Sequence, residues 1–250
     1  MAVRYERLDA VALITLDRPQ ALNAINEDLS RELREAWERF MAEEDALVAV
    51  LTGEGRAFCA GLDMKEAAEA VRNGRELRLT PQLDPRQITK PTIAAVNGPA
   101  AGGGVAFVLG CDIAICADTA VFTLPFAARG RGGAHVVLQL AQRTSYNAAL
   151  YMGLTGQRID AHTALRIGLV QEVLPPDDLL PRALELAEKI AGFSQPSVRT
   201  IKANLVHALE VGYAEALARM QGWDSGLPQE DVKEGTLAFD EKRRPRYRQP

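Results

Sequence analysis

Cysteine and histidine are scarce in this chain of 250 residues, and long hydrophobic runs are missing. The three cysteines, Cys59, Cys111 and Cys116, lack a Cys-x-x-Cys spacing, and the three histidines are too scattered for a zinc site. We therefore expect reduced, packed thiols, with neither a disulfide framework nor a bound metal. Because no stretch of about 18 apolar residues occurs and the first residues are charged, we predict no membrane span, no signal peptide and a cytoplasmic location.

An excess of positive charge is also missing. The net charge is -4, although cations gather locally in the C-terminal tail at residues 241–248. Nucleic acid is therefore an unlikely partner, although binding by this tail remains a weaker alternative. What the chain does have is 47% hydrophobic and 25% charged residues, the balance of a globular protein with one large buried core.

Short strands and helices alternate along the chain, which predicts an α/β fold. The spacing of apolar residues and capping residues predicts strands at 3–5, 11–16, 46–52, 92–97, 112–117 and 169–173. It predicts helices after Asn26, at 63–72 with Asp63 as the cap, at 103–109, 133–142 and 145–152, after Asp160, after Pro175, and at 198–220 and 229–239. Residues 73–90 show no clear pattern.

Two segments of small residues, 56–63 and 98–104, each follow an apolar strand. Glycine and alanine leave backbone amides uncovered, and a helix beginning at the second segment would direct its unpaired N–H groups and positive dipole end at the same point. This layout predicts an oxyanion hole, which stabilises a thioester carbonyl as it becomes an enolate. A phosphate-binding loop is a poor match to the glycine spacing, whereas close packing of helix against strand remains an alternative.

At these and other segments the chain resembles the crotonase superfamily, also called the enoyl-CoA hydratase/isomerase family. The resemblance implies a crotonase-like spiral of ββα units over residues 1–195, which binds acyl-CoA. It also implies a helical C-terminal region, 196–250, that builds a homotrimer, often stacked as a hexamer. Coenzyme A would enter as part of an acyl-CoA thioester substrate, with no tightly bound cofactor. The matching segments are 14–24, 51–53, 57–66, 90–98, 101–104, 111–113, 154–156, 164–170 and 234–239.

The resemblance assigns the two oxyanion donors to the backbone N–H groups of Leu62 and Gly103. For Arg18, Lys65 and Lys242, a solvated surface charge is the competing interpretation. The implied contacts with coenzyme A are Arg18, Gln20, Ala21, Leu22, Ala60, Leu62 and Lys65, together with Phe239 and Lys242 from the same or a neighbouring subunit.

Two residues depart from the family pattern. Ala106 and Phe126 stand where the resemblance places the two glutamates of a hydratase, and Ala134 stands where a nucleophilic aspartate would be expected in a dehalogenase. Neither alanine nor phenylalanine can transfer a proton, and acid or base groups typically contribute about 10² to 10⁴ in rate. The two-carboxylate hydration mechanism is therefore doubtful for this chain.

The loop that follows Phe126 is cationic. Arg129, Arg131 and His135 are the polar groups we expect to approach the acyl end. An imidazole, with an unperturbed pKa of about 6.5, could transfer a proton, and an arginine could hold a carboxylate on the acyl group. Surface or subunit-contact charges are the alternative for the arginines, and a place on the following helix without a catalytic role is the alternative for His135.

Two functional hypotheses follow. In the first, the chain is an enzyme whose oxyanion hole serves hydration or dehydration, a double-bond shift, decarboxylation, thioester hydrolysis or carbon-carbon cleavage. In the second, it is a noncatalytic acyl-CoA binder or scaffold that has lost its acid and base. The glycine-rich segments favour the first hypothesis, and Ala106 and Phe126 favour the second.

Overall fold

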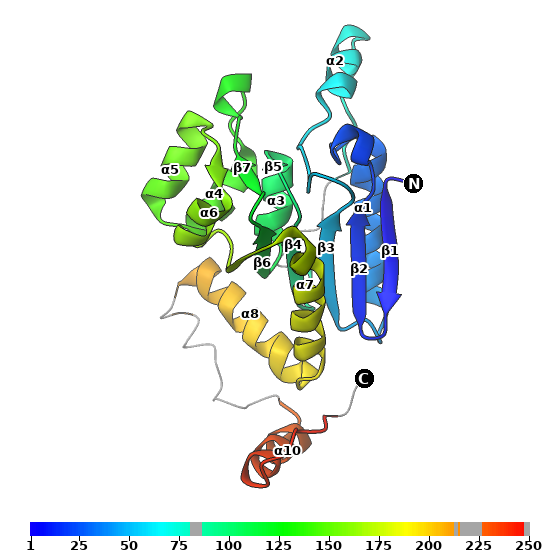
Figure 1. Ribbon diagram of the computed structural model, residues 1–250, viewed down its shortest axis with the longest axis vertical. Coiled ribbons are helices and arrows are strands. Elements are labelled where there is room, and N and C mark those ends of the chain that lie inside the picture. The colour runs from blue at the N-terminus through cyan, green and yellow to red at the C-terminus, as the bar shows by residue number, and fades with distance from the viewer. Residues whose placement is uncertain (81–86, 213–214, 216–226, 248–250) are drawn as a thin grey trace.

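A six-stranded sheet forms the centre of the computed structural model, which describes residues 1–80, 87–212, 215 and 227–247 (Figure 1). Strands β1 and β2 form an antiparallel hairpin, and every later neighbour pairs in parallel. Parallel pairs require crossover connections, and helices provide most of them here. The order is β1 (Val3–Leu8), β2 (Val11–Leu16), β3 (Val48–Gly53), β4 (Thr92–Val96), β6 (Ile113–Ala117) and β9 (Glu172–Leu174).

Helices cover both faces of this sheet. Alternate side chains of β3 point to opposite sides, so Val48 and Val50 pack towards α7 (Pro176–Ala191), while Ala49 and Leu51 pack towards α1 (Glu27–Ala42). Burial on both faces explains why the sequence of this strand is apolar without alternation. The central strands and the α/β class are as predicted.

A second, three-stranded sheet lies with α3, α4, α5 and α6 beside the central sheet (Figure 1). Its strands have only two or three residues each, too few for a periodic signal, so the sequence did not predict them. They are β5 (Ala100–Ala101), β7 (Val121–Thr123) and β8 (Ile159–Asp160), and the helices are α3 (Gly103–Gly110), α4 (Ala134–Arg143), α5 (Tyr146–Thr155) and α6 (Ala161–Arg166).

Side-chain caps start the helices as their sequences predict. The Asn26 side chain accepts a hydrogen bond from the Leu29 amide at 2.9 Å at the start of α1. The Asp63 carboxylate accepts from the Lys65 and Glu66 amides at 3.2 and 3.3 Å and begins α2 (Met64–Arg72). Each cap satisfies first-turn donors that a helix cannot pair internally.

Two predicted elements were wrong. The predicted strand at 169–173 is shifted, because the Leu169 amide turns back to the Ala164 carbonyl at the end of α6 and strand β9 begins only at Glu172. The helix predicted at 198–220 is α8 (Gln195–Val211), which starts earlier and ends at Gly212, where φ is 82°. Its predicted end at residue 220 lies outside the described residues. The last helix, α10 (Gln229–Asp240), agrees with the prediction.

The segment that showed no sequence pattern is held against α1. Residues 75–80 have no regular secondary structure, yet the Arg78 amide donates to the Glu27 carboxylate at 2.8 Å and the Thr80 amide to the Ser30 hydroxyl at 3.0 Å. Backbone-to-side-chain bonds of this kind leave no periodic trace in the sequence. Residues 81–86 lie outside the described part of the chain.

The three cysteines are free and buried, as predicted. Burial raises the pKa of the Cys59 thiol, and likewise those of Cys111 and Cys116, to about 12. These thiols therefore stay protonated near neutral pH and contribute packing, because only a thiolate is a nucleophile or metal ligand. In the described part of the molecule, no helix combines the length and apolar character needed to cross a membrane.

Candidate active site

A cavity of about 1280 Å³ opens where the two small-residue segments meet α3, α4 and α8. One end is formed largely by backbone, at Gly61, Leu62 and Gly103. The other end is lined by longer side chains, including Leu138 of α4 and Leu209 of α8. A concave, mainly apolar space with a few polar groups is typical of a small-molecule site.

The Leu62 amide borders this cavity without an acceptor. Gly61 and Asp63 pair with Ile25 on one side: the Ile25 amide donates to the Gly61 carbonyl at 2.7 Å, and the Asp63 amide donates to the Ile25 carbonyl at 2.8 Å. Because successive N–H groups of an extended segment point to opposite sides, the Leu62 N–H is directed away from Ile25. Within the described residues it donates no hydrogen bond.

The Gly103 amide is similarly unpaired in the part of the chain that is described. Gly103 is the first residue of α3, where an N–H group has no partner within the helix. The preceding Gly102 has φ of 52°, a conformation that glycine tolerates, and its amide donates to the Thr123 carbonyl at 2.9 Å. The positive end of the α3 dipole therefore faces the cavity next to a free donor.

The two segments are in direct contact. Cys59 pairs with Ala100, because the Ala101 amide donates to the Cys59 carbonyl at 2.9 Å. A methyl group on Gly61 would lie 2.5 Å from the Ala101 carbonyl oxygen and 3.4 Å from the Gly103 nitrogen. The structure thus brings Leu62 and Gly103, both singled out from the sequence, onto touching segments at one cavity end.

Apolar side chains occupy the positions at which the resemblance placed glutamates. Ala106 and Phe126 both line the cavity. The Phe126 ring lies close to both Gly102 and Gly133. A methyl group added to Gly102 would be 3.6 Å from Phe126 Cε1, and a methyl group added to Gly133 would be 2.8 Å from Phe126 Cδ2. This wall can confine an acyl group but cannot exchange protons with it.

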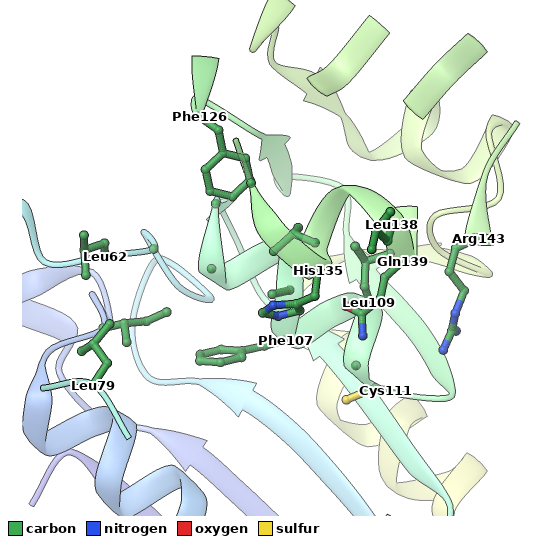
Figure 2. A pocket seen from close by; sticks show the side chains of 18 of the residues that line it. Leu62, Leu79, Phe107, Leu109, Cys111, Phe126, His135, Leu138, Gln139 and Arg143 are labelled. Atoms are coloured by element: carbon green, nitrogen blue, oxygen red, sulfur yellow. The ribbon is translucent and has the colours of Figure 1, made fainter. Parts of the chain in front are cut away.

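His135 lies on α4 and lines the cavity, as the sequence suggested. Figure 2 shows its imidazole beside the ring of Phe107, with Leu62 across the cavity. Gln139 and Arg143 follow on the same helix face at intervals of four residues and also line the cavity, although we did not identify them from the sequence. The helical spacing from His135 is the signal that could have found them.

Arg129 and Arg131 also line the cavity, on the loop between β7 and α4. Arg129 ends the short 3-10 helix η3 (Ala127–Arg129), and both residues are exposed. Their side chains form no ion pair or hydrogen bond with any other described residue. Their charges are therefore available to a molecule in the cavity.

Arg18, a predicted contact for coenzyme A, is not a solvated surface charge. Its side chain is 19% exposed, pairs with Asp63 at 3.2 Å and donates to the Ala24 carbonyl at 2.5 Å. The ion pair joins the first turn of α2 to residues that lie 45 positions earlier in the chain. Because both side chains are largely shielded from solvent, salt screens this pair less than it would screen an exposed one.

The other N-terminal contact residues lie around the same strand ends. Gln20 is exposed and Ala21 half-buried in the 3-10 helix η1 (Pro19–Ala21), and the Leu22 carbonyl accepts a hydrogen bond from the Ala60 amide at 2.9 Å. Lys65 is exposed in the first turn of α2. The structure therefore gathers the predicted residues 18–22 and 60–65 beside the Leu62 end of the cavity.

Phe239 and Lys242, also predicted to contact coenzyme A, do not lie with residues 18–22 and 60–65 in a single chain. Phe239 is 87% exposed on α10, and Lys242 follows the end of that helix. In Figure 1, α10 lies beyond α8, at the opposite end of the molecule from α2. Within one chain, these two residues therefore do not meet the other predicted contacts.

The chain is similar to known proteins along nearly its whole length. A family model described as enoyl-CoA hydratase/isomerase matches residues 6–250. The chain is similar to (E)-benzylidenesuccinyl-CoA hydratase of Thauera aromatica, with 37% identity over 264 residues covering 99% of both chains. It is also similar to the solved structure of an enoyl-CoA hydratase from Bacillus anthracis, with a TM-score of 0.88, 31% identity and 100% of both chains covered. The crotonase-like fold predicted from the sequence is thereby confirmed.

Proposed function

The chain belongs to the enoyl-CoA hydratase/isomerase family, and we propose that it binds the carbonyl oxygen of an acyl-CoA thioester between the amides of Leu62 and Gly103. The observation that carries this proposal is the pair of unengaged N–H groups, within the described residues, on touching segments at one cavity. Donors fixed in the backbone need no reorganisation as negative charge develops on the oxygen, which is why they lower the barrier to enolate formation.

The coenzyme A part of the bound substrate would extend out of the cavity past its Leu62 end. Residues 18–22 and 60–65 are gathered there, and the exposed Gln20 and Lys65 can reach a ligand on the surface. Arg18 would stay paired with Asp63, where it fixes the shape of this surface and also contributes its positive charge to coenzyme A binding. Cationic and polar side chains suit the phosphates of the coenzyme.

His135 is the proton-transfer group in this proposal. Ala106 and Phe126 cannot exchange protons, and the guanidinium groups of Arg129 and Arg131 offer hydrogen-bond donors but no acceptor. His135 of α4 and Phe107 of α3 both line the cavity, and the imidazole points towards the Phe107 ring in Figure 2. Histidine is the side chain that ordinarily changes charge between pH 5 and 8, which matches proton transfer to and from an enolate near neutrality.

Replacing His135 by glutamine tests this role. We expect kcat/KM to fall and its dependence on pH to change, because an amide cannot transfer a proton, while the KM for the thioester changes little. His162→Gln is the matched control, since His162 is also an exposed histidine on a helix, α6, but does not line the cavity. A pH profile of His135→Gln that follows the parent enzyme would remove His135 from the mechanism.

Hydration or dehydration is the first reaction to test. The Thauera aromatica relative is named as a hydratase, and both reactions pass through the charge that an oxyanion hole stabilises. A panel of 2-butenoyl-CoA, 3-hydroxybutanoyl-CoA, malonyl-CoA and butanoyl-CoA separates the reaction classes. We expect turnover of the first two, seen as a loss of enoyl thioester absorbance for 2-butenoyl-CoA and a gain for 3-hydroxybutanoyl-CoA. Butanoyl-CoA should only bind, which calorimetry measures.

A noncatalytic acyl-CoA binder or scaffold is the second candidate. The apolar Ala106 and Phe126 favour it, because they remove both expected carboxylates. Such a protein would bind several esters of the panel and turn over none of them. Binding without turnover at any pH between 6 and 9 would establish this candidate in place of the enzyme.

An assembly of subunits is part of the proposal. Ile201, Leu205 and Leu209 form an apolar stripe on α8 and are 60%, 64% and 57% exposed. Because such a stripe on a monomer favours burial against a partner, we assign residues 196–250 to the contacts of a homotrimer or hexamer. Phe239 and Lys242 would then reach the coenzyme A bound by a neighbouring subunit.

A further inference from the structure

The charges around the cavity are unevenly distributed. Among the described residues that line it, the carboxylates are Asp112 and Glu210, which lie with Arg143 away from the oxyanion segments. The Asp112 carboxylate already accepts from Lys202 Nζ at 2.7 Å. The remaining charged or basic lining residues are Arg129, Arg131 and His135. The loop of the two arginines is bonded to Phe126, whose ring lies against Gly102, so the side of the cavity next to the start of α3 is cationic.

The backbone holds these two arginines in a defined loop. The Arg129 and Arg131 amides both donate to the Phe126 carbonyl, each at 2.9 Å, and Gly130 between them has φ of 64°. The loop thus returns to the residue that forms the apolar wall. Two guanidinium groups are placed at the mouth of the cavity by a turn that closes on Phe126.

Several other arginines of the described chain are already held in ion pairs. These pairs include Arg18 with Asp63, Arg182 with Glu172 at 2.9 Å, and Arg243 with Glu234 at 2.6 Å. Arg129 and Arg131, in contrast, have no acidic partner within the described structure. A guanidinium presents its donors in a fork that matches a carboxylate.

We propose that the acyl group of the substrate carries a carboxylate and that Arg129 and Arg131 bind it. The inference rests on the proposed function, because it requires the thioester carbonyl to lie between Leu62 and Gly103. The Phe126 wall then confines the carbon chain between the two anchored ends. Since an arginine stabilises the carboxylate in the ground state, the arrangement suits a carboxylate that is retained through the reaction, not one that leaves as carbon dioxide.

Calorimetric binding of saturated CoA esters tests the proposal without requiring turnover. Succinyl-, glutaryl- and adipyl-CoA end in a carboxylate, whereas butanoyl-, pentanoyl- and hexanoyl-CoA have matching chain lengths and end in a methyl group. Only the terminal carboxylate can accept the forked hydrogen bonds of a guanidinium, and the methyl-ended esters have no such group. We therefore expect at least one dicarboxylic ester to bind about tenfold or more tightly than its match.

Variants assign the preference to the loop. We expect Arg129→Gln and Arg131→Gln each to reduce the preference for the dicarboxylic ester while leaving the affinity for its methyl-ended match unchanged. Arg158→Gln is the control, since Arg158 is an exposed arginine outside the cavity, and it should keep the preference of the parent protein.

Two results would overturn the proposal while leaving the proposed function intact. One is equal binding of the two esters at every chain length. The other is an equal loss of affinity for both esters in the arginine variants, which would place the guanidinium groups on coenzyme A itself. Failure of all six esters to bind would instead contradict the proposed acyl-CoA function together with this inference.

Discussion

Gly103→Pro is expected to lower kcat by about 10² or more, the usual cost of losing one oxyanion donor. Proline has no backbone N–H, so the substitution removes the proposed donor itself. The protein should still fold, because Gly103 is the first residue of α3 and proline is favoured at that helix position. Turnover of the best ester from the panel and a circular dichroism spectrum measure the two effects separately.

Gly103→Ala separates the donor from the added bulk. A methyl group at Gly103 would meet only Ile25 Cδ1, at 2.6 Å, which is the end of a side chain that can rotate. Alanine keeps the N–H, so kcat should stay within about tenfold of the parent, well above that of the proline variant. If folded Gly103→Pro matched Gly103→Ala in kcat, the Gly103 amide would not be an oxyanion donor.

The local parts of the fold could be predicted because each depends on neighbouring residues. Asn26 and Asp63 cap the helices that follow them, and the apolar run in β3 indicates burial on both faces. The two small-residue segments could be predicted in the same way, because runs of glycine and alanine are visible in the sequence and leave backbone amides uncovered. The position of Leu62 and Gly103 at one cavity is therefore close to what the sequence implied.

The rest depends on contacts between distant residues. The pair of Arg18 with Asp63 spans 45 positions, and neither residue indicates the other in the sequence. Strands as short as β5 and β8 are defined by their partners, since two residues carry no period. The helical spacing from His135 places Arg143 on the same face of α4, but which way that face turns depends on how α4 packs on α3.

Glycine at position 61 connects the stability of the fold to the geometry of the proposed site. Its φ is 79°, and the space for a side chain is taken by the backbone of the second segment. The left-handed conformation costs a residue with a Cβ about 1–2 kcal/mol, and overpacking costs typically about 1–3 kcal/mol. A substitution here must also push the two donor segments apart.

Gly61→Ala should therefore lower the free energy of unfolding by about 2–5 kcal/mol and reduce turnover in the fraction that remains folded. Gly74→Ala is the matched control, because Gly74 has φ of 64° and nothing within 4 Å of the added methyl group. Gly74→Ala should lower the free energy of unfolding only by the cost of the left-handed conformation, about 1–2 kcal/mol, and leave kcat unchanged. Urea denaturation gives the stabilities, and the best ester of the panel gives the rates.

The comparison of the two variants distinguishes a crowded contact from a conformational penalty. If Gly61→Ala and Gly74→Ala lose the same free energy of unfolding, the segments at Gly61 and Ala101 are not in close contact. The argument that this contact holds the Leu62 and Gly103 amides together would then fail. If Gly61→Ala is destabilised but retains full turnover, the spacing of the amides is irrelevant to the reaction. Only a larger loss of stability at Gly61, joined to a loss of turnover, agrees with two backbone donors held at one oxygen by the contact between their segments.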